Sequence, residues 1–67
     1  MFVWELVSSR LRGQGWNVWH MRGHDASGPV YRVHLERPGR QCMGIAPTLT
    51  EAYAAAARQV RDQKDRE

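Results

Sequence analysis

The sequence predicts an α+β fold in which one antiparallel three-stranded sheet carries two helices on a single face, in the order α-β-β-β-α. Three observations lead to this prediction. Residues 48–64 have the apolar spacing of a helix, residues 30–37 alternate as a half-buried strand does, and hairpin-length connections join the strand segments. With 67 residues the chain is one domain at most, and we expect residues 62–67 to be a frayed, charged tail.

The first element is a short helix over residues 2–12. Its apolar residues recur at spacings of three and four, and Gly13 and Gly15 end it because glycine readily adopts the conformation that closes a helix. The side chains expected on its buried face are Val3, Leu6, Val7 and Leu11, with Phe2 and Trp4 at the border.

Three strand segments follow. Residues 16–22 are rich in aromatic and β-branched side chains, and residues 23–29 have the glycine, aspartate, serine and proline content of a loop. Residues 30–37 alternate cleanly between apolar and polar, and residues 41–46 form a shorter third strand after a Pro-Gly turn. The predicted sheet is therefore a meander.

The last helix begins at Thr48 and has the strongest local signals. Thr48 and Glu51 have the spacing of a capping box, in which each side chain bonds to the other residue's amide. Four consecutive alanines add helix propensity and a slim profile that allows close packing on a sheet. The stripe expected to face the sheet is Leu49, Ala52, Tyr53, Ala56 and Val60.

Strand alternation predicts a second, uncovered face of the sheet. If the small residues of the third strand lie under the alanine-rich helix, Met43 and Ile45 point away from it. The open face then carries Trp19, Met21, Arg32, His34, Met43 and Ile45. A face this apolar indicates a docking surface, for a partner protein or for a second copy of the chain. The alternative is a register shifted by one residue on one strand, which would bury these side chains.

The charged residues are dominated by arginine. The formal net charge is +3, nine of the ten basic residues are arginine, and residues 48–67 carry equal numbers of both signs. The excess positive charge therefore lies outside the last helix, where it is compatible with a polyanion partner and also ordinary for a small soluble protein. The predicted binding residues are Trp19, Met21, Arg22, Arg32, His34, Arg37, Arg40 and Met43.

Several kinds of site have no support in the sequence. Cys42 is the single cysteine, which excludes an intrachain disulfide and fits a reducing compartment, so we expect the bacterial cytoplasm. The N-terminus has the form of neither a signal peptide nor a membrane span. His20, His24, His34 and Cys42 match no established zinc spacing, and we expect no metal and no cofactor.

The segment from Gly28 to Val60 resembles the later part of a double-stranded-RNA-binding domain, with its Gly-Pro loop, hairpin and alanine-rich last helix. That resemblance implies RNA contacts from the first helix, the Gly-Pro loop and a basic cluster at the start of the last helix. Here those helix-opening positions are Thr48, Leu49, Thr50 and Glu51, so the phosphate-binding cations of the family are missing.

Two further resemblances are to other families, the first over nearly the whole chain and the second over its opening segment. Gly15–Trp16 and the threonine-capped helix of residues 48–57 are similar to the phage ABA sandwich family, which implies a phage or prophage origin. The opening segment, ELVSSRLRGQGWNVWHMRGHD, is similar to HicA-type toxins, which are small ribonucleases with a catalytic histidine on a strand. His24 matches that histidine, although Gly23 stands directly before it where the family has Gly-Ser.

The sequence thus favours a non-enzymatic interaction module that binds a protein, or a second copy of itself, through the sheet face and the hairpin arginines. A nucleic-acid-binding protein and a small ribonuclease toxin are the two alternatives from other functional classes.

Overall fold

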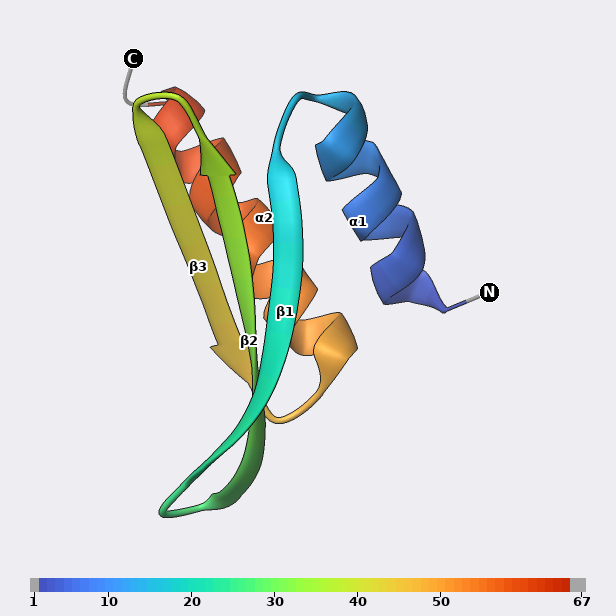
Figure 1. Cartoon of the computed structure of the whole chain (residues 1–67), viewed down its shortest axis with the longest axis vertical. Coiled ribbons are helices and arrows are strands. Elements are labelled where there is room, and N and C mark those ends of the chain that lie inside the picture. Colours follow the sequence, from blue (N-terminus) through green and yellow to red (C-terminus); the bar gives the residue numbers. More distant parts are fainter. Residues whose placement is uncertain (1, 66–67) are drawn as a thin grey trace.

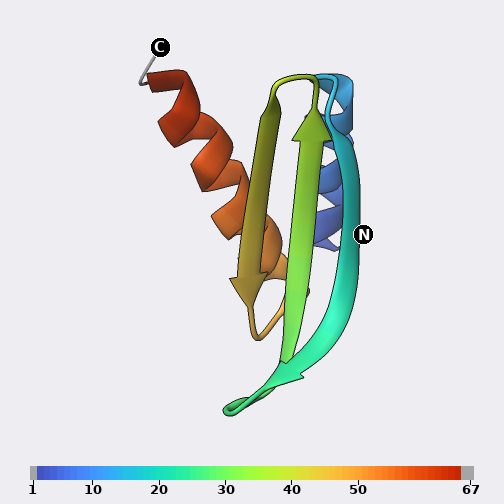
Figure 2. The same cartoon turned by 60° about the vertical axis from the view of Figure 1, so that its left-hand side comes forward.

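The fold is the predicted α-β-β-β-α arrangement. A computed structural model of the chain describes the backbone of residues 2–65 and the side chains of residues 2–63. Helix α1 spans Val3–Gly13, the strands are β1 (Asn17–Asp25), β2 (Gly28–Arg37) and β3 (Arg40–Ala46), and helix α2 spans Leu49–Asp65. The strands form one antiparallel sheet in the order β1-β2-β3, and both helices lie on the same side of it (Figures 1 and 2).

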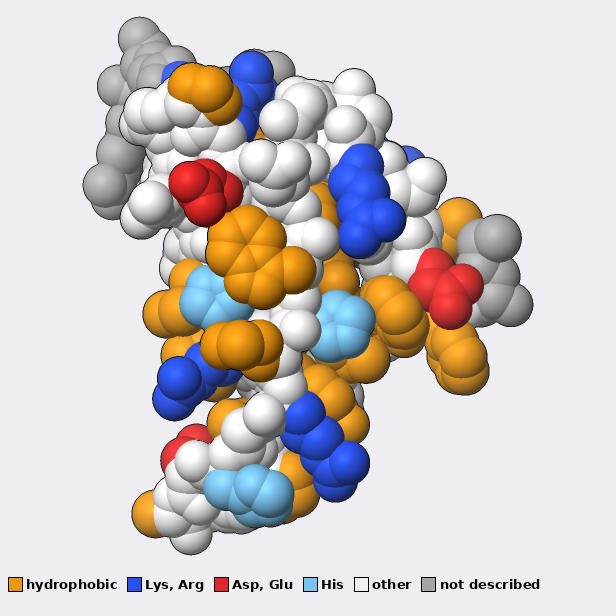
Figure 3. Space-filling view, in the orientation of Figure 1, with side chains coloured by type: hydrophobic (Ala, Val, Ile, Leu, Met, Phe, Trp, Pro, Cys, Tyr) orange, Lys and Arg blue, Asp and Glu red, His pale blue; other side chains and the backbone are white. Residues whose placement is uncertain are grey.

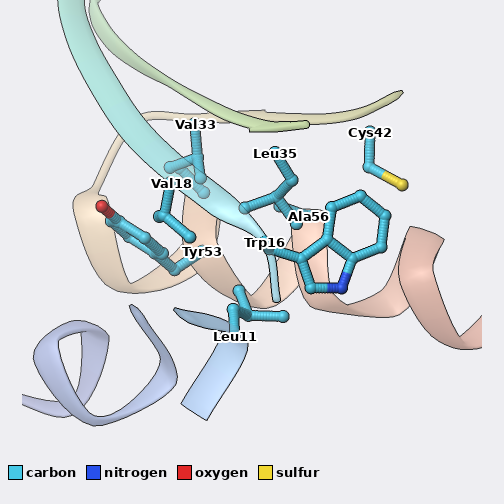
Figure 4. Packing of buried hydrophobic residues seen from close by; sticks show 9 residues of the cluster. Leu11, Trp16, Val18, Val33, Leu35, Cys42, Tyr53 and Ala56 are labelled. Atoms are coloured by element: carbon cyan, nitrogen blue, oxygen red, sulfur yellow. The ribbon is translucent and has the colours of Figure 1, made fainter. Parts of the chain in front are cut away.

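The core lies between the helices and the inward-facing residues of the sheet. Trp16 and Val18 lead into and along β1, Val33 and Leu35 come from β2, and Cys42 comes from β3, as the alternation pattern predicts. Helix α2 adds Ala52, Tyr53 and Ala56, and α1 adds Leu11 (Figure 4). Within this cluster Tyr53, Leu35 and Val33 are the largest fully buried side chains.

The buried face of α1 differs from the prediction. Leu11 is buried and Val7 partly buried, as predicted, but Val3 and Leu6 are exposed, and Trp4 and Ser8 turn inward in their place. The physical reason is that Trp4 stacks on Tyr53, with ring centroids 5.5 Å apart. The aromatic contact and the small Ser8 fix the rotation of the helix, whereas a count of apolar residues favours Val3 and Leu6.

The predicted loop at residues 23–29 is wrong. Strand β1 continues to Asp25 and β2 begins at Gly28, so the hairpin turns on two residues. Asp25 Oδ1 accepts hydrogen bonds from the amide and the hydroxyl of Ser27, at 2.8 Å and 2.6 Å, and Gly28 takes a φ of 121°. These local bonds close a tight turn, and the resulting arm projects beyond the helices (Figure 1).

The ends of α2 also refine the prediction. Thr48 Oγ1 accepts the amide of Glu51 at 3.2 Å, but among the described residues the Glu51 carboxylate makes no return bond, so only half of the capping box is formed. Within the expected frayed tail of residues 62–67, the backbone is helical as far as Asp65, and Arg66 and Glu67 lie outside the described residues.

Candidate interaction surfaces

The open face of the sheet is built from two rows of residues that cross all three strands. In register order the rows are Trp19, His34 and Met43, and then Met21, Arg32 and Ile45. The four apolar members are 41% to 51% exposed. Of the two alternatives that the sequence leaves open, the structure has the exposed face, since the helices cover the other side. Figure 3 shows hydrophobic and histidine side chains gathered over the strands, with cationic side chains around them.

His34 occupies the centre of this open face. Its ring stacks on Trp19, with centroids 5.4 Å apart and planes 10° from parallel. The Nε2 atom is covered and has no hydrogen-bond partner among the described residues. Leaving a buried polar atom unpaired costs free energy, so His34 is held there by ring packing.

The predicted binding residues divide between three places. Trp19, Met21, Arg32, His34 and Met43 share the open face. Arg22 lies on the projecting hairpin and, by strand alternation, points to the opposite side. Arg37 and Arg40 flank the β2–β3 turn and point toward the helix side. The hairpin arginines therefore do not form one surface.

A groove on the helix side brings Arg37 and Arg40 together with residues that the sequence does not single out. It has a volume of about 770 Å³ and lies between α1 and α2 at the end of the sheet. Its lining consists of Val7, Arg10, Leu11, Gln14, Trp16, Arg37, Arg40, Ala54, Ala57, Arg58, Val60 and Arg61. Five of these are arginines, and no acidic side chain among the described residues lines the groove.

Counting charges does not reveal Arg58 and Arg61 as groove residues, because the positive and negative charges of residues 48–67 cancel. The useful signal is positional. Ala54, Ala57, Arg58 and Arg61 are spaced three, four and seven apart and share one helix face. That face is adjacent to the buried stripe, and only the fold shows that it meets the end of α1.

A second feature that sequence reasoning missed is a cluster of rings between α1, β1 and α2. The Tyr53 hydroxyl lies 2.8 Å from His20 Nδ1. The ring centroid of Trp4 is 5.4 Å from that of His20 and 5.5 Å from that of Tyr53. Burial raises the pKa of Tyr53, while a hydrogen bond from Ser8 and the charge of Arg12 act in the opposite direction. The cluster fastens the start of α1 to the sheet.

The remaining potentially reactive side chains, His24, His34 and Cys42, lie in different parts of the fold and do not form one site. His24 stands on the exposed hairpin and makes no side-chain hydrogen bond or ring contact within the described residues. Cys42 is buried, and desolvation raises the pKa of its thiol, which disfavours the nucleophilic thiolate. His34 lies on the open face and Cys42 on the buried face, so these two do not converge on a metal.

Two kinds of feature are absent from the described residues. No group of three or more His, Cys, Asp or Glu side chains is arranged to hold a metal ion within residues 2–63. None of the helices in the described part of the chain is both long enough and apolar enough to cross a membrane.

The chain was compared with protein-family models, with curated proteins and with solved structures, and none of the three comparisons gave a match.

Proposed function

We propose that this chain is a non-enzymatic protein-interaction module that docks through the open face of its sheet, and that the partner is a second copy of the same chain. The observation that carries the proposal is the pair of rows on the open face, in which four large apolar side chains surround His34 and Arg32. A patch of this kind on a small domain is typical of an association surface.

Charge complementarity supports a second copy as the occupant. Arg32 and Glu36 lie on the same face of β2, two residues to either side of His34. A two-fold axis that runs across the strands above His34 brings Arg32 of each copy opposite Glu36 of the other. The axis along the strands would place like charges together, so the charge pattern selects the antiparallel arrangement of the two β2 strands.

The size of the chain supports the same conclusion. A domain below about 70–80 residues buries little apolar surface by itself and is commonly stabilised by disulfides, metals or association. The single Cys42 leaves no intrachain disulfide here. Packing two sheets face to face, about 10 Å apart, would bury the central row of each copy in a shared core.

The test is the mass in solution, measured by light scattering or by sedimentation. We expect a dimer for the wild type and a monomer for Trp19→Asp, because an aspartate beside His34 on this face would be buried without a partner in the dimer. Leu6→Asp is the matched control, since Leu6 is an exposed apolar residue on α1. A monomeric wild type, or a dimer broken by Leu6→Asp and not by Trp19→Asp, would refute the proposal.

A charge exchange tests the orientation of the two copies. Arg32→Glu and Glu36→Arg are each expected to weaken the dimer by placing like charges opposite each other. The double variant restores the opposite charges and is expected to recover the dimer. If the dimer affinity lost in the double variant equals the sum of the losses in the two single variants, the antiparallel arrangement is wrong.

A further inference from the structure

The groove between the helices has two facing walls of similar design. On one wall, Val7, Arg10 and Leu11 of α1 are followed by Gln14, directly after the end of the helix, at spacings of three, four and seven from Val7. On the other wall, Ala54, Ala57, Arg58 and Arg61 of α2 have the same spacings. On both walls the apolar residues are flanked by arginine. The result is an apolar floor with a cationic rim.

Three rim arginines make no ion pair within residues 2–63, the part of the chain whose side chains the structure describes. Arg10, Arg58 and Arg61 are exposed and make no hydrogen bond, ion pair or ring contact with the described residues. Arg37 is held in place, because Nη1 donates to the Gln14 carbonyl at 3.1 Å and the guanidinium lies 5.4 Å from the centroid of Trp16. An arginine fixed in this way is preorganised for an anion.

Helix dipoles do not account for these cations. The C-terminus of a helix carries roughly half a negative charge, and its effect is confined to the last turn. Arg10 lies in the last turn of α1, so the dipole of that helix accounts for part of its stabilisation there. Arg58 and Arg61 precede the last turn of α2, which ends at Asp65. A positive rim therefore remains for a ligand.

The floor distinguishes between classes of anionic partner. Single-stranded nucleic acids need exposed aromatic faces for their bases to stack upon. Trp16 is only 4% exposed and is already covered by Arg37, and the rest of the floor is aliphatic. Phosphates alone gain nothing from an aliphatic floor. The small side chains of Ala54 and Ala57, in contrast, allow the backbone of another helix to approach closely.

We propose that this groove binds an acidic amphipathic helix of a partner protein, with its apolar side chains on the floor and its carboxylates on the arginine rim. Helix-in-groove recognition uses anchors at the spacings that both walls present, and arginine is suited to bidentate contact with carboxylate. The groove lies on the helix side, away from the open face, so the inference does not rest on dimerisation.

The experiment uses fluorescence anisotropy with a designed probe. The probe is a 15-residue peptide with leucines at positions i, i+3, i+4 and i+7 and glutamate at most other positions. A second peptide has the same composition with the leucines evenly dispersed, and a third has lysine in place of glutamate. We expect saturable binding of the first peptide alone, with an affinity that falls as salt rises.

Single charge reversals locate the binding site. Arg58→Glu and Arg61→Glu are each expected to lower the affinity for the acidic probe about tenfold, because an attractive rim contact becomes repulsive. Arg22→Glu on the hairpin makes the same change in net charge and is the matched control, with an expected change below about twofold. Ala54→Trp fills the floor without changing the charge and is expected to abolish binding.

Each other outcome overturns the proposal. No binding of the acidic probe shows that the groove does not take such a helix. An equal loss in Arg22→Glu shows that net charge, not the groove, is responsible. A 20-base-pair RNA or DNA duplex that binds the wild type more tightly than the probe, and loses affinity in Arg58→Glu, assigns the groove to nucleic acid instead.

Discussion

Gly44 sets the distance between β3 and α2. A Cβ atom added at this position would lie 2.6 Å from the Ala56 amide nitrogen and still closer to the Ala52 carbonyl oxygen. Both obstacles belong to the helix backbone, which cannot move aside as a flexible side chain does. The alanines of α2 and this glycine therefore act as one contact, in which the absence of side-chain atoms allows the helix to lie directly on the strand.

We expect Gly44→Ala to destabilise the fold by about 3 kcal/mol, because overpacking forces the helix away from the sheet. Chemical denaturation monitored by tryptophan fluorescence measures the change. Gly23→Ala is the matched control: its added methyl group meets nothing within 4 Å, so its stability should change by less than about 1 kcal/mol. Equal stability losses in the two variants would show that the close approach at Gly44 is not responsible.

Tyr53 combines a buried ring with a hydroxyl that contacts α1 and β1. Its side chain is 1% exposed, yet the hydroxyl lies 2.8 Å from His20 Nδ1. Burial is the main reason that its pKa is raised from the ordinary value of 10.0. The unfolded chain therefore loses the phenol proton at a lower pH than the folded chain does.

This difference predicts a loss of stability in alkali. Below the unfolded pKa both states keep the proton, and the contribution is fully present. As the pH rises above about 10 the unfolded state binds fewer protons than the folded state, so the free energy of unfolding falls until the folded pKa is passed. The free energy of unfolding should fall less in alkali for Tyr53→Phe than for Tyr31→Phe, which keeps Tyr53. Denaturation at successive pH values measures the difference. The same decrease in both variants would contradict the assignment.

At the scale of elements, α2 depends on a single side-chain cap. Thr48 Oγ1 accepts the Glu51 amide, and the Thr48 carbonyl accepts the Ala52 amide at 2.9 Å as the first helical bond. Further along, Gln59 Oε1 accepts the amide of Met43 at 3.0 Å, and Gln63 donates to the carbonyl of Gln41 at 3.3 Å. The helix thus also covers backbone groups at the free edge of β3, which protects that edge from pairing with another strand.

Thr48→Ala is expected to cost about 1 kcal/mol, since it removes the acceptor for one amide at the start of α2. Thr50→Ala is the control, because Thr50 lies inside the first turn, is exposed and makes no side-chain bond with the described residues. Thermal unfolding followed by circular dichroism provides the comparison. Were Thr50→Ala to cost as much as Thr48→Ala, the cap would not explain the loss.

The elements differ in how far the sequence determines them. Strand β2 and helix α2 are predictable because their apolar periodicity coincides with burial. The apolar positions are Tyr31, Val33 and Leu35 in β2, and Ala52 and Ala56 in α2. The β1 half of the hairpin arm is not predictable from apolarity, because residues 22–25 are glycine or polar, and the strands there are held by backbone pairing and by the Asp25 turn.

At the scale of the molecule, the two faces differ in chemistry. The open face is apolar and includes Arg32 and Glu36 among its charges, whereas the helix side concentrates five arginines around a mainly aliphatic floor. The chain carries a net charge of only +3. The distribution, rather than the total, therefore distinguishes the proposed partners of the two surfaces.

Self-association through the open face makes stability depend on concentration. A folded dimer that unfolds to monomers is favoured by mass action, so the melting temperature should rise over a roughly hundredfold increase in protein concentration. Trp19→Asp should remove that dependence, and Leu6→Asp should retain it. A wild-type melting temperature that is independent of concentration would argue against the dimer.

The sequence alone determined the order of elements and the inward residues of β2, since strand alternation has a fixed period of two. It left open whether Trp19, Met21, Met43 and Ile45 face solvent or the core, and the strand register of the folded chain decided that they are exposed. Tertiary structure decided the rotation of α1, because Trp4 finds a stacking partner in Tyr53 from the other end of the chain. It also decided where the arginines gather. Arg10, Arg37 and Arg58 are distant in sequence, and only the packing of two helices on one sheet brings them to the same groove.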